Sequence, residues 1–155
     1  MEIVIWDNKY ITGIGLIDHQ HKQLVDLTNE LYSACHAREE ELCDTFKHAM
    51  SGMVEYVHFH FSTELELLRK LKFPEYHEHK MMHDTLIQNI LTAAKDFNEG
   101  KKFVPNHFVR TLKDWIFSHI AIHDKEYALY VKDQIRLGLL TQQFISDIER
   151  SLSHQ

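Results

Sequence analysis

The sequence has few of the residues that interrupt helices. Its 155 residues include five glycines and two prolines. Because turns depend mostly on these two residue types, their scarcity argues against a turn-rich β-sheet and favours long helices. The chain is long enough to bury a sizeable hydrophobic core as one domain. We therefore expect a single all-α domain.

Cysteine, positive charge and long apolar runs are also scarce. Cys35 and Cys43 have a spacing that fits no zinc motif, so we expect reduced thiols. The formal net charge of −6 and the lack of a basic stripe argue against a nucleic-acid partner. No apolar run reaches the roughly 20 residues that a membrane-spanning helix needs. The apolar start, Met1 to Trp6, lacks the basic flank of a secretion signal, so we expect a cytoplasmic protein.

Capping and helix-breaking residues predict where the first two helices begin and end. Asp18 can cap a first helix that runs to about Ala37. The acidic run Glu39–Glu41 suits the start of the second helix, because negative charge is favourable there. Pro74 disfavours helical backbone at the residue before it, so the second helix should end near Lys72.

The remaining breaks complete the predicted fold. Gly100 should end the third helix, and Pro105 should open a fourth that runs through His119 or beyond. Short connections make consecutive helices antiparallel, so we predict an up-down-up-down four-helix bundle. The expected domain spans residues 1–155. It begins with an extended N-terminal arm (1–17), continues with the bundle (18–130) and ends with a short helical tail (131–155).

The thirteen histidines are the outlying feature of the composition. Five of them lie on apolar seams of the four expected helices, spaced by three or four residues from apolar neighbours: His21, His60, His79, His83 and His119. Glu64 follows His60 by one helical turn, so both can reach one ion. Each histidine alone could be an ordinary core residue with a hydrogen-bond partner. Because the helices alternate in direction, all six side chains should lie at one end of the bundle, which indicates a metal site.

The expected ligands point to two metal ions. Five imidazoles and a carboxylate are too many donors for one tetrahedral zinc ion, and they suit two imidazole-accepting ions such as iron. Di-iron proteins of the ferritin-like type use Glu-x-x-His motifs on two helices. The one such match here, Glu55–His58, lies off the apolar seam.

Four segments of the sequence resemble the bacterial hemerythrins. They are Gly13–Lys22 with Trp6 before it, His60–Glu64, the pair His79 and His83 after Pro74, and Trp115–Tyr127. The resemblance covers roughly residues 3–130. It implies an iron centre of two ions with a bridging oxo or hydroxo group, and dioxygen as its ligand. One iron would be held by His79, His83 and His119. The other would be held by His21 and His60, with Glu64 and Asp124 bridging the pair.

The assignment of Asp124 makes a structural demand. Asp124 follows His119 by five residues, about 140° around an ideal helix, whereas His123 would point the same way as His119. A carboxylate can bridge two cations and offset their charge, so we favour Asp124. The helix must then end or bulge just after His119. Leu65 stands where related proteins often carry a second acid, and we expect only a surface or packing change there.

Apolar side chains are expected to enclose the open iron position and exclude water: Leu24, Phe61, Trp115 and Ile120. Trp115 and Tyr127 are further candidates for contacts with the ligands. The other histidines are expected to be exposed or to support the ligands: His19, His36, His48, His58, His77, His107, His123 and His154.

The function that the resemblance implies is reversible dioxygen binding, for oxygen storage, delivery (oxygen transport) or sensing. No catalytic acid, base or nucleophile stands out beyond the ligands. The alternative is an enzyme that reduces peroxide or nitric oxide, or a protein that donates iron for repair, and Tyr56 and Tyr76 keep this alternative open. We expect a monomer with no nucleic-acid or membrane partner, and the sequence identifies no protein partner.

Overall fold

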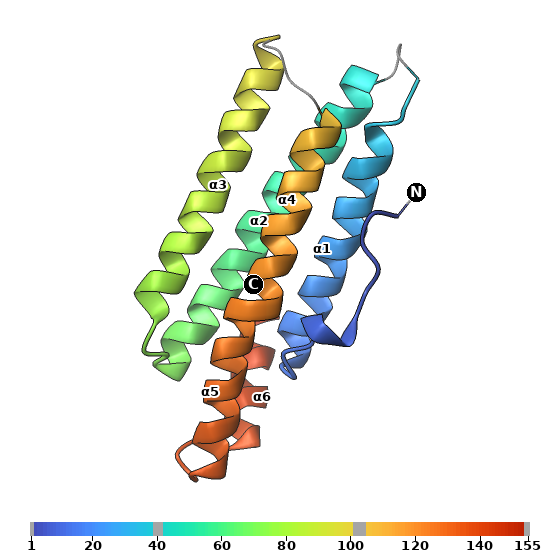
Figure 1. The fold of residues 1–155 in the computed structure, drawn as a ribbon. Helices are drawn as coiled ribbons and strands as arrows, with labels where there is room; N and C mark the ends of the chain where they lie inside the picture. Colours follow the sequence, from blue (N-terminus) through green and yellow to red (C-terminus); the bar gives the residue numbers. More distant parts are fainter. Residues whose placement is uncertain (1, 39–41, 101–104, 154–155) are drawn as a thin grey trace.

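Helices account for all the regular secondary structure in residues 2–38, 42–100 and 105–153, which are the residues that the computed structural model describes. The prediction of an all-α, four-helix bundle is confirmed (Figure 1). In chain order the elements are the 3-10 helix η1 (Asn8–Tyr10), α1 (Gly15–Ala34), α2 (Leu42–Leu71), α3 (Tyr76–Asn98), α4 (Pro105–His119), the π-helical turn η2 (Ile120–Asp124), α5 (Lys125–Arg136) and α6 (Gln142–Leu152).

Helices α1 to α4 run alternately up and down and enclose the main core. Each presents its apolar stripe to the centre, where Leu31, Met53, Ile90 and Val109 are almost completely buried. The N-terminal arm lies along the outside of α1 (Figure 1). Asn29 holds the arm in place, because its side-chain oxygen accepts hydrogen bonds from the backbone N–H groups of Ile3 and Val4. None of the described helices combines the length and apolarity that crossing a membrane would require.

The first helix begins earlier than predicted. It starts at Gly15, so the prediction that Asp18 caps it was wrong. Asp18 lies in the first turn, and its carboxylate accepts hydrogen bonds from the backbone N–H groups of Thr12 and Gly13. Gly13 has a φ of +84°, a conformation that favours glycine and lets the arm turn back toward that carboxylate. The predicted role of Glu39–Glu41 as a helix start lies outside the described residues.

The next two helices end close to the predicted positions. α2 ends at Leu71, and Lys72 takes the left-handed conformation with a φ of 54°. The N–H of Phe73 then donates to the carbonyl of Leu68 at 3.0 Å, which closes the last turn before Pro74. α3 ends at Asn98, and Gly100 has the left-handed φ of +66° expected of a terminating glycine.

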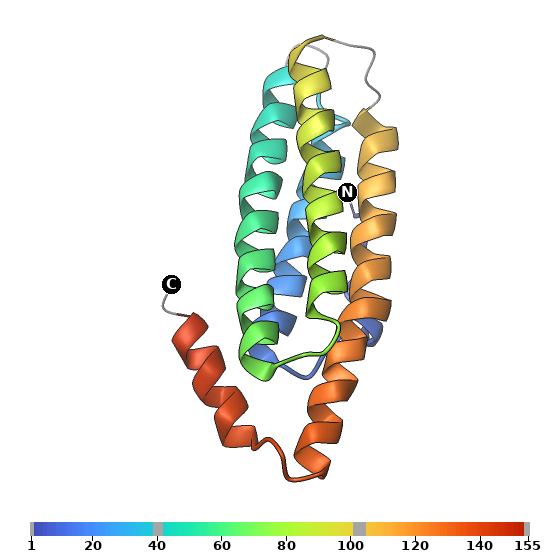
Figure 2. The same ribbon diagram turned by 90° about the vertical axis from the view of Figure 1, so that its left-hand side faces the viewer.

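The C-terminal part contains more structure than the short tail that we expected. α4 continues through η2 into α5, which runs to Arg136. The chain then reverses, and α6 folds back against the end of α2 (Figure 2). Three apolar residues of α6 are buried there in a second core, together with residues of α1, α2 and α5: Ile145, Ile148 and Leu152. This second core closes the end of the bundle at which α1 begins.

Candidate metal centre

Seven predicted ligands meet inside the bundle, at the end where α1 and α3 begin and α2 and α4 end. α1 provides His21, α2 provides His60 and Glu64, α3 provides His79 and His83, α4 provides His119, and η2 provides Asp124. None of these side chains is more than 4% exposed. Seven buried polar groups at one level need mutual partners or a ligand, since an unpaired buried polar group costs about 1–3 kcal/mol.

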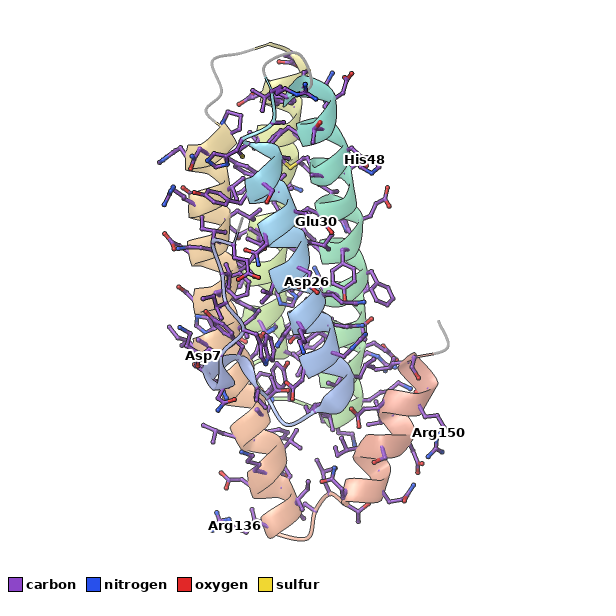
Figure 3. All side chains as sticks on the ribbon, turned by 90° about the vertical axis from the view of Figure 1, so that its right-hand side faces the viewer. Asp7, Asp26, Glu30, His48, Arg136 and Arg150 are labelled. Atoms are coloured by element: carbon purple, nitrogen blue, oxygen red, sulfur yellow. The ribbon has the colours of Figure 1, made fainter. Side chains whose placement is uncertain are left out.

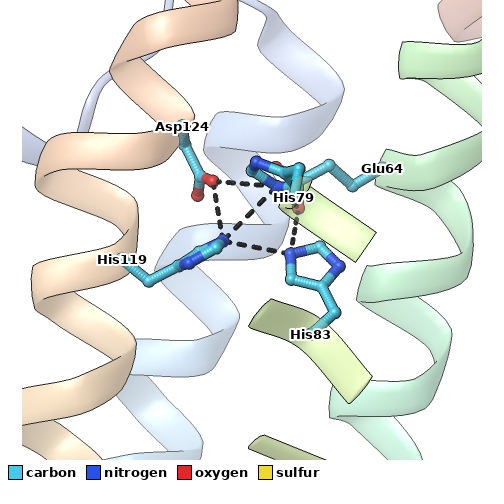
Figure 4. A group of neighbouring side chains, drawn as sticks. All are labelled: Glu64, His79, His83, His119 and Asp124. Carbon is cyan, nitrogen blue, oxygen red and sulfur yellow. Dashed lines mark hydrogen bonds and ion pairs between the residues drawn. The ribbon is translucent and has the colours of Figure 1, made fainter. Parts of the chain in front are cut away.

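Three histidines form one half of the centre, which we call the three-histidine half (Figure 4). The Nε2 atom of His119 lies 3.0 Å from Nε2 of His83 and 3.3 Å from Nε2 of His79. Two nitrogens that each lie about 2.1 Å from one ion, at right angles, are themselves about 3.0 Å apart. The three rings therefore point their Nε2 atoms at one position, with the spacing that a shared metal ion produces.

Two histidines form the other half, which we call the two-histidine half. His21 Nε2 lies 3.1 Å from Asp124 Oδ2, and His60 Nε2 lies 4.0 Å from Glu64 Oε2. Their rings pack edge to face with centroids 5.0 Å apart. This half has one imidazole fewer than the other.

Both carboxylates lie between the two halves. Glu64 Oε2 is 3.1 Å from His83 Nε2 and 3.4 Å from His79 Nε2, and it also faces His60. Asp124 reaches His119 with Oδ1 at 3.2 Å and His21 with Oδ2. Each carboxylate therefore contacts imidazoles of both halves, the arrangement that a bridge between two ions requires.

A π-helical turn brings Asp124 into the centre. Residues Ile120–Asp124 form this turn directly after α4, so the predicted irregularity after His119 is confirmed. A π turn holds one more residue than an α turn, so the residue five after His119 returns to the inner face. Asp124 is completely buried, whereas the His123 side chain is 35% exposed and faces Glu126 at 3.4 Å. The geometry thus favours Asp124 over His123.

Hydrogen bonds orient both imidazoles of the two-histidine half. The Nδ1–H group of His21 donates to the backbone carbonyl of Tyr10 at 3.3 Å. The Nδ1–H group of His60 donates to the side-chain oxygen of Gln20 at 3.0 Å. When either imidazole is neutral, its hydrogen therefore lies on Nδ1 and its Nε2 has a lone pair that faces the centre.

Aromatic stacking supports two imidazoles of the three-histidine half. Phe61 stacks on His83 with centroids 3.6 Å apart and an interplanar angle of 7°. Trp115 stacks on His119 at 5.0 Å and 8°. The two stacking partners belong to the apolar wall that we predicted, and Leu24 and Ile120 are buried in the main core beside them. Trp115 therefore backs the three-histidine half alone, whereas Phe61 also packs against the ring of His60 in the half with the expected open position, with centroids 5.6 Å apart.

Tyr127 links the metal centre to the second core. It is completely buried on α5, and its hydroxyl donates a hydrogen bond of 2.5 Å to Glu64 Oε1. The other oxygen of Glu64 faces the histidines. This contact, together with edge-to-face packing on His79 at 5.7 Å, places Tyr127 against a predicted bridging ligand.

The surroundings keep both carboxylates ionised. Burial acts to raise the pKa of Glu64, but hydrogen bonds from His79 and His83 outweigh it and hold that pKa well below its usual range. Burial and the charge of Glu64 act to raise the pKa of Asp124, but His119 and His21 outweigh them and lower it to about 2. At neutral pH both side chains are therefore in the charged form that binds cations.

The pKa values of the histidines diverge. Burial lowers the pKa of His60 to about 3, and it also lowers the pKa of His83. Burial acts in the same direction on His21 and His79, but the neighbouring Asp124 and Glu64 outweigh it and raise their pKa. The imidazole of His60 is neutral at physiological pH, with its hydrogen on Nδ1, so its Nε2 offers a lone pair to a metal ion without first losing a proton.

The unpartnered atoms of the centre fit a metal ion. Within the described residues, the buried side-chain atoms that lack a hydrogen-bond partner are His21 Nε2, His83 Nδ1, His119 Nδ1 and both carboxylate oxygens of Asp124. Three of these five atoms face the gap between the two halves, from His21 and Asp124. A buried ionised carboxylate needs a compensating positive charge, which a metal ion would provide. Imidazole nitrogens and carboxylate oxygens are a donor set that iron accepts.

Two surface pockets reach the three-histidine half. One contains Trp115, Ser118 and Ile122 and borders His119. The other lies beside His83, and Leu65 belongs to its lining. Six of the remaining histidines are exposed, as expected, among them His48 on the outer face of α2 (Figure 3). His154 lies outside the described residues.

Sequence reasoning missed two contributors to the centre. Gln20 is only 2% exposed and orients His60 from another helix. One signal was available, because Gln20 lies one turn before Leu24 on the inner side of α1. The second contributor is the backbone carbonyl of Tyr10. No side-chain pattern could have revealed it.

Comparisons with known proteins agree with this geometry. A family model described as the hemerythrin HHE cation binding domain matches residues 12–130. Bacteriohemerythrin of Stenotrophomonas maltophilia is 26% identical over 132 residues, covering 85% of this chain and 84% of that protein. Bacteriohemerythrin of Methylococcus capsulatus is 28% identical over 129 residues, covering 82% and 95%. A crystal structure of wild-type hemerythrin has a TM-score of 0.75 and 26% identity, covering 81% of this chain and 95% of that one.

Proposed function

Because the chain belongs to the hemerythrin family, we propose that it binds dioxygen reversibly at a non-haem di-iron centre. The observation that carries the proposal is the cluster of buried ligand atoms, in which two ionised carboxylates lie between two groups of imidazoles. Both oxygens of the buried Asp124 carboxylate face imidazole nitrogens of different halves, and buried imidazoles and carboxylates grouped in this way are a donor set that iron accepts.

The proposed ligands form two groups, one for each ion, according to the distances between their imidazole rings. His79, His83 and His119 would hold one iron, and His21 and His60 would hold the other. Glu64 and Asp124 would bridge the pair, together with an oxo or hydroxo group. The two-histidine half has fewer protein ligands, so a small ligand would find its open position there.

Reduced iron would supply the electrons with which such a centre holds dioxygen. The protein contributes fixed ligand orientation and a dry environment. Tyr10 and Gln20 hold His21 and His60 with Nε2 toward the centre. Leu24, Phe61 and Ile120 are at most 5% exposed, and they exclude bulk water that would promote irreversible oxidation.

The test is the visible absorption of the anaerobically reduced, iron-loaded protein as dioxygen is admitted and then removed. We expect an absorption band that appears with dioxygen and disappears when dioxygen is withdrawn, over several cycles. Immediate and permanent conversion to the oxidised protein would contradict reversible binding. Storage, delivery and sensing would then be separated by the oxygen affinity and the cellular concentration of the protein.

One observation favours a second candidate function, the reduction of peroxide or nitric oxide. The hydroxyl of Tyr127 contacts the proposed bridging ligand Glu64, and a tyrosine in that place can deliver a proton or an electron. If this function holds, the reduced protein will consume peroxide or nitric oxide over many turnovers when a reductant is present to restore the reduced protein. A Tyr127→Phe variant would then turn over more slowly while still holding two irons.

A further inference from the structure

Helix α6 lies beyond the segment that matches the family, yet it is a well-packed part of the structure. The family match ends at residue 130, and α6 spans Gln142–Leu152. Its inner residues Ile145, Ile148 and Leu152 are at most 5% exposed. Its outer residue Arg150, like Arg136 at the end of α5, points away from the molecule (Figure 3).

Glu149 of α6 caps the start of α1. Its Oε1 atom accepts a hydrogen bond from the backbone N–H of Leu16 at 2.8 Å, between residues 133 positions apart. The residue that precedes α1, Ile14, makes no side-chain capping bond of its own among the described contacts. A carboxylate at this place satisfies a free N–H group and interacts favourably with the helix dipole. The first turn of α1 is therefore held by a helix from the far end of the chain.

The turn that Glu149 holds leads directly to the two-histidine half. Gln20 and His21 follow Leu16 by little more than one helical turn. His21 is a predicted ligand, and Gln20 orients the other one, His60. A shift or fraying of the first turn of α1 would therefore disturb both imidazoles of this half together.

The apolar contacts of α6 reach the centre by a second route. Ile145, Ile148 and Leu152 share the second core with Tyr127, whose hydroxyl donates to Glu64. α6 thus supports a predicted bridging ligand as well as the start of α1. Both routes begin at α6 and end at groups that hold metal in the proposed centre.

We propose that α6 is a positioning element of the metal centre, and that Glu149 is the residue through which it fixes the two-histidine half. Glu149 touches no metal ligand itself; it acts through Leu16 and the first turn of α1. This inference rests on the proposed function, because it assumes that the centre binds iron. A purely structural α6 would stabilise the bundle equally with and without metal.

The test compares the rates at which a chelator removes iron from the full-length chain and from variants of α6. Glu149→Ala removes the cap, Glu149→Gln keeps an oxygen that can accept the bond from Leu16, and Asp147→Ala is the matched control on the exposed side of α6. We expect about tenfold faster release of one iron from Glu149→Ala, at the low end of effects on residues that support ligands. Glu149→Gln and Asp147→Ala should release iron as the unaltered chain does.

A second readout needs no metal. In the metal-free proteins, hydrogen exchange of the amides in residues 16–21 should be faster in Glu149→Ala than in the unaltered chain, while α3 exchanges at the same rate. If Glu149→Ala does not fold, Glu149→Asp replaces it. Aspartate keeps the charge, but its side chain is too short to reach the N–H of Leu16 from the same backbone position.

The outcomes separate the inference from the proposed function. An unaltered chain that binds no iron would overturn the proposed function and this inference with it. An unaltered chain with two irons and a folded Glu149→Ala variant with the same release rate would overturn the inference alone. Equal losses of melting temperature in the metal-free and iron-loaded forms of Glu149→Ala, with unchanged iron release, would assign α6 a purely structural role.

Discussion

The two halves of the metal centre are supported in different ways. In the two-histidine half, each imidazole donates a hydrogen bond through Nδ1, the nitrogen that faces away from the centre. His21 donates to the backbone carbonyl of Tyr10, and His60 donates to the side-chain oxygen of Gln20. In the three-histidine half, the rings of Phe61 and Trp115 stack on His83 and His119. The Nδ1 atoms of these two histidines have no hydrogen-bond partner in the described part of the chain.

This difference indicates different tasks for the two halves. A hydrogen bond to Nδ1 fixes the ring and makes Nε2 a stronger donor. That benefit matters most where an ion has only two imidazoles. Three imidazoles that converge on one ion constrain one another, so ring packing is sufficient to align them. We expect the two halves to respond differently to loss of their supporting residues.

The largest effect should come from removing a ligand of the three-histidine half. His119→Ala should lower the iron content from two ions per chain to one or none, and it should reduce the thermal stability of the loaded protein, because metal binding and folding are linked. Iron analysis and a melting curve measure both effects. His58→Ala, which changes an exposed histidine on α2, should keep two irons. A His119→Ala variant with two irons would refute the ligand assignment.

The next largest effect should come from removing the hydrogen bond between His60 and Gln20. Gln20→Leu removes the acceptor but keeps the volume, and we expect iron affinity to fall about 10- to 100-fold. The measurement is a competition for iron against a chelator of known affinity. Gln23→Leu is the matched control, because Gln23 is an exposed residue of the same helix whose side-chain oxygen accepts a hydrogen bond from Tyr56 and not from a histidine of the centre. Equal affinities for the two variants would show that the hydrogen bond to His60 is not needed.

The pH dependence of the metal-free protein should reveal the buried, neutral state of His60. Its pKa is about 3 in the folded chain and 6.5 in an unfolded one, so between these values only the unfolded state binds the proton. Acid therefore favours unfolding. Between pH 7.5 and 5.5, the unfolding free energy of the unaltered chain should fall by roughly 1 kcal/mol relative to His60→Gln. Denaturant titrations at the two pH values measure this difference, and a constant difference would contradict it.

The smallest effect should come from the stacking behind His83. Phe61→Leu keeps an apolar side chain but removes the parallel ring contact, which is worth about 0.5–1.5 kcal/mol, or roughly a 2- to 10-fold change in iron affinity. Phe59→Leu is the control, because Phe59 is 45% exposed on the same helix. A loss for Phe61→Leu greater than that for Gln20→Leu would reverse the comparison between the two halves.

The parts of the centre that were predictable depend on helical periodicity and charge. The spacing of His60, Glu64, His79 and His83 places them on inner helix faces without any knowledge of their partners. Once the family resemblance had assigned Asp124 as a ligand, an end or bulge of the helix after His119 was predictable as well, and the structure has a π turn there. A carboxylate five residues after His119 can reach the same ions only if the helix is irregular between them.

The parts that were not predictable depend on contacts between distant segments. The role of Gln20 becomes apparent only when α1 and α2 are packed in the correct register. The position of α6 depends on a hydrogen bond between Leu16 and Glu149 and on a second core shared by several helices. Asp18 was a plausible cap by residue type, but its carboxylate binds the arm, and Glu149 provides the cap from the other end of the chain.

The most direct test of the proposed centre is a crystal structure of the iron-loaded protein with diffraction data collected on both sides of the iron absorption edge. We predict two iron peaks in the anomalous difference map, one within bonding distance of His79, His83 and His119 and the other beside His21 and His60. Glu64 and Asp124 should contact both peaks. A single peak, or iron bound to His123 in place of Asp124, would contradict the seven-ligand centre.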